Sequence, residues 1–272
     1  MKQIKRYLRL YRVLASQFLK TIMQSKADFF MGLIGFFLTQ IAGIVFLNLV
    51  FQQIPDLKGW SLEQLLFIYG FAQIPRGIDH LFTDNIWMIA WRYVVNGNFD
   101  RYMLRPMNLF FQVISEKLQP DAIGELLVGT ILVVRALGKG VLVIDAVHII
   151  LFFVSVIAGA LIYTAIKLFF ASFAFWIKCS GPVLQVAYEM AEFAKYPTEI
   201  YVKPIRFIIT WIIPFAFVAY LPASYFLGVN GFMGFDNHAV VIAIEWGIAI
   251  VFCIVAYALF QKGTRAYESA GN

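Results

Sequence analysis

Long apolar blocks alternate with short polar segments along this chain, and the clearest block runs from Phe29 to Phe51 without a charged residue in 23 positions. At about 1.5 Å of rise per residue, a helix of that length crosses a hydrocarbon core of about 30 Å. The pattern predicts an all-α membrane protein, a single domain over residues 1–272 with six transmembrane helices at about 29–51, 62–90, 120–137, 141–170, 207–227 and 239–260.

Several of these spans depart from a plain apolar run. Glu125 interrupts the third, and the fourth can be extended as far as Trp176. A helix of that length is longer than the bilayer is thick, so we expect its end to project into the cytoplasm. Pro75 in the second span and Pro214 in the fifth each remove a backbone hydrogen bond and predict a kink.

Two amphipathic helices are predicted outside the spans. In residues 1–26, apolar side chains recur at helical spacing while basic side chains gather on another face, which is typical of an interfacial helix. A plain positively charged anchor for the first span would explain the charge but not the apolar stripe, and the segment does not resemble a cleavable signal peptide. A second helix begins at Ser180-Gly181-Pro182 and runs to about Lys195, and we expect it at the cytoplasmic interface.

Composition and charge support a membrane protein and argue against nucleic-acid binding. The chain has 61% hydrophobic and 14% charged residues, far from the balance of a soluble domain. All of its 22 Lys and Arg fall on the cytoplasmic side of a six-span arrangement, except Lys58, Arg76, Arg135 and Lys139. This bias predicts that both termini are cytoplasmic, and it explains the net charge of +6 without a nucleic-acid partner.

The most distinctive polar segment, residues 91–117, joins the second and third spans on the predicted cytoplasmic side. Asn96-Gly97 is typical of a turn, Asp100 is placed to cap a short helix, and Arg105-Pro106 would end that helix. Any cytoplasmic loop is expected to be basic and rich in turn residues, but a plain connection needs no such order. We therefore interpret the segment as a compact turn, helix and turn at the membrane surface.

Ionisable residues inside the second span form one helical face. Arg76, Asp79, His80 and Asp84 are spaced at i, i+3, i+4 and i+8, so Arg76 is predicted to pair with Asp79 or His80 within a turn. Charged side chains near the bilayer centre cost about 2.5 to 3.5 kcal/mol each, so this face should turn toward protein or water. It can form the wall of a translocation path or an ion-pair network that braces the bundle. Glu245 in the sixth span, and Asp121 with Glu125 in the third, raise the same question.

Motifs for catalysis are absent from the sequence. There is no Gly-x-x-x-x-Gly-Lys-Ser/Thr phosphate loop, and Gly138-Lys139-Gly140 lacks both the preceding glycine and the following hydroxyl residue. His-Glu-x-x-His and Gly-x-Ser-x-Gly are also missing, and the two cysteines have no CxxC spacing. The sequence therefore predicts no enzyme, no metal site and no cofactor bound by this chain.

Two segments carry a likeness to a known family. The first is Gly97-Asn98-Phe99-Asp100-Arg101-Tyr102-Met103-Leu104-Arg105-Pro106, and the second runs from Tyr196-Pro197-Thr198-Glu199-Ile200-Tyr201 through Arg206 to Ile212-Ile213-Pro214-Phe215 and Pro222-Ala223. They resemble the integral-membrane subunits of bacterial type-2 ABC exporters, in particular the six-span permeases related to daunorubicin-resistance and viologen-export proteins. Their order and their separation by two spans extend the likeness over nearly the whole chain.

The resemblance implies a multi-pass permease of the bacterial cytoplasmic membrane, surrounded by lipid, that works with a separately encoded ATP-binding subunit and a second permease copy or paralogue. ATP and Mg would be bound by the partner ATPase. The residues that couple to this partner would be Gly97, Asp100, Arg101, Leu104, Arg105 and Pro106. The likeness also implies a short re-entrant external hairpin after the fifth span, where Pro222 and Gly228 begin a series of helix breakers.

A different class of function is left open by the charges in the second span. An ion-coupled secondary transporter would use Arg76, Asp79 and Asp84, but such folds usually show internal repeats with paired broken helices, and no clear repeat relates the halves of this chain. Aromatic-rich spans with few charges suit an amphiphilic or hydrophobic cargo. The direction of transport, which is export, follows from the resemblance alone.

Overall fold

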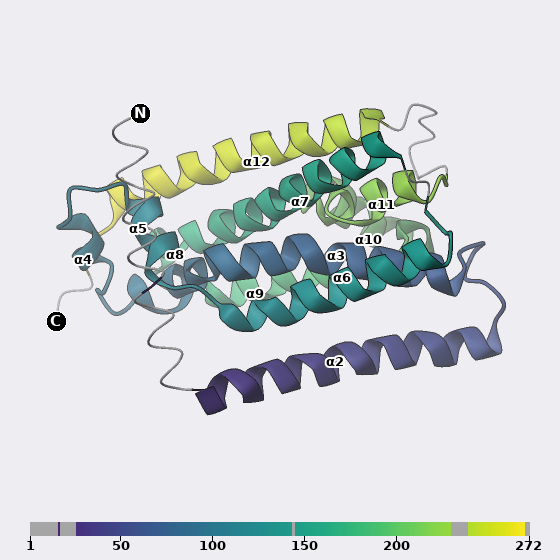
Figure 1. Cartoon of the computed structure of the whole chain (residues 1–272). Coiled ribbons are helices and arrows are strands. Elements are labelled where there is room, and N and C mark those ends of the chain that lie inside the picture. The colour runs from purple at the N-terminus through teal and green to yellow at the C-terminus, as the bar shows by residue number, and fades with distance from the viewer. Residues whose placement is uncertain (1–15, 17–25, 143–144, 230–238, 270–272) are drawn as a thin grey trace.

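The computed structural model describes residues 16, 26–142, 145–229 and 239–269, and in these residues the backbone forms helices and no strand. The five long helices lie side by side along one direction (Figure 1). The long ones are α2 (Lys26–Gln53), α3 (Leu62–Thr83), α6 (Ile123–Gly138), α7 (Ala146–Ser172) and α12 (Ala239–Ala266). The shorter ones are α4 (Asp100–Met103), α5 (Leu109–Glu116), α8 (Ala174–Ile177), α9 (Gly181–Glu189), α10 (Lys203–Phe207) and α11 (Tyr220–Phe226). The interfacial helix predicted in residues 1–26 lies outside the described residues, apart from residues 16 and 26.

Among the described residues, three helical stretches are long and apolar enough to cross a membrane, namely Phe29–Gln53, Ala146–Ile177 and Val240–Ala266. A fourth candidate is the bent pair Lys203–Ile212 and Phe215–Phe226, whose halves meet at 74°. The predicted second and third spans are present as α3 and α6. Neither is among these stretches, because α3 carries several charges and α6 has 16 residues. The structure therefore shows a multi-pass helical membrane protein. That the chain crosses the membrane six times stays a prediction.

Helix α3 is buried against α6 and α7 over much of its length. It starts with a capping box, in which the Ser61 amide donates to the Gln64 side chain and the Ser61 hydroxyl accepts from the Gln64 amide. Gly70 allows the close approach of α6, because a Cβ at this position would lie 2.5 Å from the Leu132 Cβ. The α-helix ends at Thr83, earlier than the predicted limit of the span, and 3₁₀ and π-helical turns follow as far as Tyr93.

Helix α7 packs along α12 and is the longest buried element of the bundle. Asp145 caps it by accepting a hydrogen bond from the His148 amide at 2.8 Å, so the helix begins at Ala146, later than the predicted limit of 141. The helical stretch continues through α8 to Ile177, 32 residues in all. This agrees with the longer of the two predicted ends of the fourth span.

The segment from Gly181 to Ile200 runs along the whole of α3, from its C-terminal end to its N-terminal end. Gly181 lies against the Trp91 ring, Tyr188 bonds to Asp79, and the Glu199 carbonyl accepts from the Lys58 ammonium at 2.6 Å. The segment is α9 followed by 3₁₀ turns. The helix is where the sequence predicts it in the chain, and it packs along α3, while its position at the cytoplasmic interface stays a prediction. Of its charged residues, Lys195 is buried and pairs with Glu192, whereas Glu189 and Glu192 are exposed.

Residues 203–227, where the sequence predicts a fifth span kinked at Pro214, form a broken hairpin of two short helical segments. Helix α10 and the π-helical turns to Ile212 lead in, and the chain bends by 74° at Pro214, where the missing N–H cannot continue the helix. The tip residue Phe215 lies 5.4 Å from the Tyr163 ring in the middle of α7, whereas Arg206 donates to the Thr198 carbonyl near Lys58. The bend predicted at Pro214 is thus confirmed, while Pro222 lies inside α11. Most of the predicted external hairpin, residues 230–238, is outside the described part of the chain.

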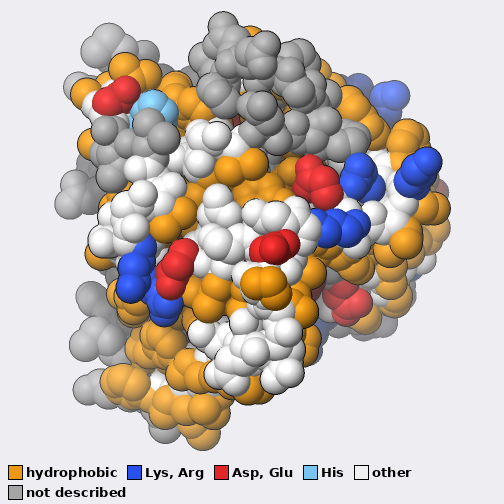
Figure 2. Space-filling model, turned by 90° about the vertical axis from the view of Figure 1, so that its right-hand side faces the viewer, with side chains coloured by type: hydrophobic (Ala, Val, Ile, Leu, Met, Phe, Trp, Pro, Cys, Tyr) orange, Lys and Arg blue, Asp and Glu red, His pale blue; other side chains and the backbone are white. Residues whose placement is uncertain are grey.

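Charged side chains are present at the end of the bundle opposite α4 and α5. One end holds α4, α5 and α8 (Figure 1), and the opposite end, with the α2–α3 loop, shows acidic and basic side chains among hydrophobic ones (Figure 2). Arg206, and with it Lys203, lies at this second end, while Lys167 and Lys195 are buried inside. Over the described residues the bias of basic side chains toward one end is therefore smaller than the sequence analysis predicts.

Candidate functional site

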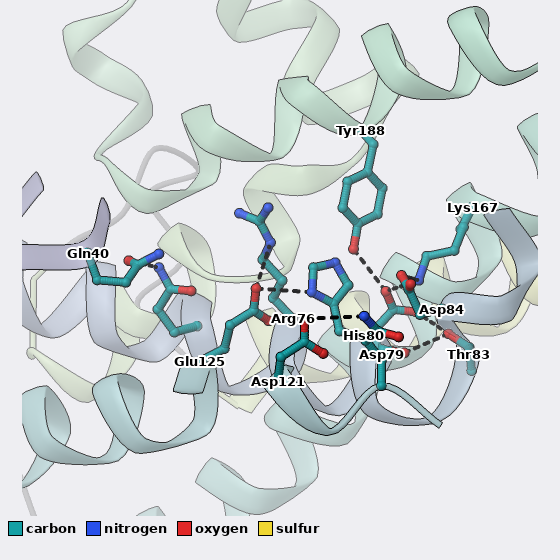
Figure 3. A network of polar contacts seen from close by, with 12 residues as sticks. Gln40, Arg76, Asp79, His80, Thr83, Asp84, Asp121, Glu125, Lys167 and Tyr188 are labelled. Atoms are coloured by element: carbon teal, nitrogen blue, oxygen red, sulfur yellow. Dashed lines mark hydrogen bonds and ion pairs between the residues drawn. The ribbon is translucent and has the colours of Figure 1, made fainter. Parts of the chain in front are cut away.

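A network of charged and polar side chains crosses the interior of the helix bundle (Figure 3). We call it the polar network, and its members are Arg76, Asp79, His80 and Thr83 of α3, Asp84, Glu125 of α6, Thr164 and Lys167 of α7, and Tyr188, Glu192 and Lys195 of the α9 segment. It brings together four of the five residues predicted to line a path, and Glu245 is the exception.

Asp79 is buried, and its carboxylate is engaged from three helices. The Lys167 ammonium lies 2.7 Å from Oδ2, and the Tyr188 hydroxyl donates to the same oxygen at 2.9 Å. The hydroxyls of Thr83 and Thr164 donate to Oδ1 at 2.5 and 2.8 Å. Removing one partner of a buried ion pair typically costs about 3–5 kcal/mol, because the other charge is left uncompensated in a low dielectric. Asp79 therefore ties α3 to α7 and α9.

Arg76 reaches carboxylates on two other elements. Its Nε lies 3.5 Å from Glu125 Oε1 on α6, and its Nη1 lies 2.5 Å from Glu192 Oε1. The prediction that Arg76 pairs with Asp79 or His80 of its own helix is wrong, because Asp79 is already engaged by groups of α7 and α9. The side chain of Arg76 is 19% exposed and that of Glu192 is 53% exposed, so this pair is the part of the network that faces outward.

His80 contacts Glu125, whereas the nearby Asp121 is bonded elsewhere. His80 Nδ1 lies 3.0 Å from Glu125 Oε1, and its ring stacks on the Tyr188 ring at 5.8 Å between centroids. Asp121, one turn before Glu125, accepts instead from Gln119 at 3.2 Å. Glu125 is thus shared by Arg76 and His80, which indicates that it braces the bundle. The contact of Asp121 with Gln119 does not distinguish a bracing role from a place in the path.

The other two predicted path residues stand apart from the centre of the network. Asp84 is 31% exposed and lies 3.6 Å from the Lys167 ammonium, at the edge. Glu245 of α12 is buried and accepts from the Ser155 hydroxyl of α7 at 2.7 Å. Its second carboxylate oxygen has no hydrogen-bond partner among the residues that the structure describes. Glu245 therefore joins α12 to α7, separately from the polar network.

Three important members of the network are not identified by the sequence analysis. Lys167 is counted there with the cytoplasmic charges, although it is the only Lys, Arg, Asp or Glu between Ala146 and Ile177. An isolated charge in such an apolar stretch signals a buried partner. Tyr188 and Glu192 are assigned to an interfacial helix, and no signal in the sequence alone shows that they face α3.

The chemistry of the network is that of ion pairs and hydrogen bonds. Within the described ranges, no group of three or more His, Cys, Asp and Glu side chains is arranged to hold a metal ion. Its carboxylates are engaged by Arg76, Lys167, Lys195 and hydroxyl groups. The network can therefore lock four segments together, and its most exposed ion-paired member is Glu192.

A second candidate site is the connector, which we define as residues 96–116 between α3 and α6. Gly97 has a φ of 69°, as the predicted Asn-Gly turn requires, and α4 follows it. The prediction that Asp100 caps α4 is wrong. Phe99 occupies the N-cap without a side-chain bond, and the Asp100 carboxylate accepts from the Ser269 hydroxyl at 2.6 Å. That hydrogen bond lowers the pKa of Asp100 below its usual value.

The base of the connector is held firmly. Phe99 is buried, with its ring 5.0 Å from the Phe175 ring of α8. The hydroxyl of the buried Tyr102 donates to the Glu116 carboxylate, which also pairs with Arg101 at 2.7 Å. These contacts tie α4 to α5, so the predicted compact turn, helix and turn is confirmed.

The tip of the connector is exposed. Leu104 is 84% exposed and Met103 is 48% exposed, and Arg105 and Pro106 beside them are exposed as well. Of the six residues predicted to couple to a partner, Leu104, Arg105 and Pro106 are exposed at the surface. Gly97, Asp100 and Arg101 instead shape or hold the base.

Comparison with protein families matches residues 37–271 to the model described as "ABC-2 family transporter protein". This range contains both the polar network and the connector, and it covers most of the chain. No curated protein matches the sequence.

Proposed function

Because the chain belongs to the ABC-2 family of transporter proteins, we propose that it is the permease of an ATP-driven exporter in the bacterial cytoplasmic membrane. The family match itself supports a transmembrane subunit of an ABC transporter. The finer form of the proposal is the branch related to daunorubicin-resistance and viologen-export permeases. In this proposal a separate subunit binds ATP and Mg, and the present chain receives the motion that hydrolysis produces.

The observation that carries the proposal is the connector, which is rigid at its base and exposed at its tip. The buried Phe99 and the Arg101–Glu116 pair hold α4 against α5 and the rest of the bundle. A rigid helix transmits a displacement, whereas a loose loop would absorb it. Leu104, 84% exposed beside Arg105, offers an apolar and a basic contact of the kind found at protein interfaces.

The connector also has a direct link to the helix that carries the polar network. The Asn85 amide, in the turn after α3, donates to the Val113 carbonyl of α5 at 2.7 Å, and it is buried. The Tyr93 hydroxyl donates to the Asn85 side-chain oxygen at 3.0 Å. A push on α5 is therefore expected to reach the C-terminal end of α3 and, through it, Asp79 and Arg76.

The proposed topology keeps six crossings but reassigns the fifth. They are α2, α3, α6, α7, the segment Gly181–Ile200, and α12, with residues 203–227 as a hairpin that enters and leaves at one end. The contacts of Gly181, Tyr188 and Glu199 along α3 and the 74° bend support this arrangement. The basic residues at the start of the chain favour a cytoplasmic position for the connector end and for both termini.

The proposed path runs along the exposed side of the polar network. Glu192 is 53% exposed beside Arg76, and a charged side chain that faces lipid near the bilayer centre would cost about 2.5–3.5 kcal/mol. A second permease copy or a paralogue would cover this face and complete the path, while the buried Asp79–Lys167 pair braces the bundle. An ion-coupled secondary transporter is less well supported, because Asp79 and Arg76 already have protein partners.

Reconstitution in lipid vesicles with the candidate ATP-binding subunit tests the proposal. Movement of a panel of fluorescent amphiphiles is measured with ATP, without ATP, and with an ATPase variant that cannot hydrolyse it. Transport that requires hydrolysis is the expected result. Transport that follows an ion gradient without ATP would favour the secondary transporter, and failure of the two subunits to associate would reject the permease role.

A further inference from the structure

A groove lies between the start of α5 and the last turns of α12, at the end of the bundle that carries the connector. Its cavity volume is about 280 Å³. It lies outside the polar network, and although residues 107–110 of the connector form one wall, the exposed tip at residues 103–106 does not line it, so the contact proposed for the tip does not account for it.

The floor of the groove is preformed and mainly apolar. The Phe110 ring packs edge-on against the rings of Tyr257 and Phe260, with centroids 6.0 and 6.1 Å apart. The Asn108 amide donates to the Tyr257 hydroxyl at 2.8 Å, which ties α5 to α12. A ligand would therefore meet a built surface and would need little reorganisation of the protein.

The rim of the groove is polar and basic. Gln261, Thr264 and Arg265 line it from the last turn of α12. Arg265 is exposed and takes part in none of the ion pairs found among the described residues. On the opposite wall the first turn of α5, the positive end of that helix, adds a weaker preference for negative charge.

The position of the groove along α12 indicates which ligand it meets. Residues 240–266 form one of the stretches able to cross the membrane, so its last turns lie where the span leaves the hydrocarbon. A tyrosine with an apolar ring and a polar tip, followed by a basic residue two turns later, is typical of this interface. An amphipathic groove at this depth faces lipid headgroups on one side and acyl chains on the other.

We propose that this groove binds the headgroup of an anionic phospholipid. The phosphate lies at Arg265, and the glycerol and the first part of an acyl chain lie over Phe110 and Phe260. The basic rim explains the preference for a negatively charged lipid, and the aromatic floor explains why a free anion is a poorer ligand. The proposal requires only that the chain is inserted in a membrane, and it does not depend on export or on ATP.

The test is native mass spectrometry of the purified full chain with equal amounts of phosphatidylglycerol and phosphatidylcholine. Unmodified protein is expected to retain phosphatidylglycerol preferentially. Arg265→Gln should weaken that binding about fivefold, since one basic residue near an anionic surface contributes about that factor. Gln261→Trp, which fills the groove from its exposed rim, should reduce the binding of both lipids.

Lys262→Gln is the matched control, because it removes the same charge from the same turn of α12 at an exposed residue that does not line the groove. It should bind phosphatidylglycerol as the unmodified chain does. The proposal is overturned by unchanged binding in Arg265→Gln, by an equal loss in Lys262→Gln, or by equal retention of the two lipids. Displacement of the lipid by glycerol phosphate at equal concentration would show a site for free anions and would also overturn it.

Discussion

Lys167 of α7 and Asp79 of α3 form an ion pair with 2.7 Å between Nζ and Oδ2, and neither side chain is exposed. The two residues are 88 positions apart in the sequence, so their contact fixes the way in which two of the longest helices meet. Because a membrane interior offers no water to either charge, the pair is both a constraint on assembly and a point of weakness when one partner is lost.

Asp79→Asn is expected to destabilise the bundle by about 3–5 kcal/mol, because Lys167 keeps only the more distant Asp84 as a charged neighbour. The double variant Asp79→Asn with Lys167→Met should recover part of this loss, because no unpaired charge remains. Thermal unfolding of detergent-solubilised protein measures both effects. Asp56→Asn, at an exposed position, is the control and should match the unmodified chain; an Asp79→Asn variant that does so too would exclude a bracing role.

Glu192→Gln is expected to change transport with little change in stability, because the Glu192 side chain is 53% exposed. Glu125→Gln should instead lower thermal stability, because Glu125 is buried and shared by Arg76 and His80. Substrate range in vesicles and unfolding temperature are measured for both variants. Glu189→Gln, an exposed change one turn earlier, is the matched control for Glu192. If Glu192→Gln transports every substrate as the unmodified chain does, the path does not pass this residue.

A cysteine at Lys203 is expected to be labelled by a membrane-impermeant reagent from outside intact cells, together with one at Asp56. The Glu199 carbonyl accepts from Lys58, and Arg206 bonds to the neighbouring Thr198, so Lys203 lies at the same end as Lys58, whereas the six-span prediction places Lys203 in the cytoplasm. Cysteines at Asn98 and Ser269, at the connector end, should be protected. The measurement uses a background in which Cys179 and Cys253 are replaced. Protection of the Lys203 position would return the fifth crossing to residues 207–227.

Leu104→Glu and Arg105→Glu are expected to insert normally and to lose most of their association with the ATP-binding subunit. Leu104 is 84% exposed and does not belong to the buried core. The substitutions are therefore expected to change the surface of the connector without disturbing the fold. Co-purification of the ATPase and substrate-stimulated hydrolysis are the readouts. Lys139→Glu, an exposed change at the opposite end, is the charge-reversal control.

Asp100→Ala gives a separate check on the connector. It removes the hydrogen bond to Ser269 but no cap, so α4 should keep its amide protection in hydrogen exchange. Strong loss of protection over residues 100–104 would show that Asp100 does cap α4. Association with the ATPase should remain in this variant if the tip, and not the base, forms the contact.

Much of the helical framework follows from the apolar blocks, because bilayer thickness sets a length that sequence pattern reveals directly. The first, fourth and sixth spans appear as long helices near their predicted limits. The fifth span shows what the apolar pattern leaves out. The aromatic and aliphatic residues at 207–227 are typical of a span, and Pro214 predicts a bend there, but the pattern does not reveal that the bend reaches 74° and that its tip packs against Tyr163 of α7.

The sequence predicts the residues that α3 contributes to the candidate site, but not their partners on the other helices. The spacing of Arg76, Asp79 and His80 indicates that one face of α3 meets protein or water, and this holds in the structure. Their partners were not predictable, because Lys167 and Glu192 are distant in sequence and hydropathy treats any charge as a sign of the surface. A charge inside an apolar run is better explained as half of a pair whose other half has to be sought elsewhere in the chain.

Tyr188 belongs to the polar network and to the surroundings of the hairpin at the same time. Its hydroxyl donates to Asp79 at 2.9 Å, and its ring lies 5.7 Å from the Tyr163 ring and 6.4 Å from that of Phe215 at the hairpin tip. If the hairpin tip withdraws, Tyr188 loses the packing that orients it, and if the Asp79 pair separates, Tyr188 loses its acceptor. The hairpin at one end of the molecule and the buried charges at its centre are therefore expected to rearrange as one cooperative unit.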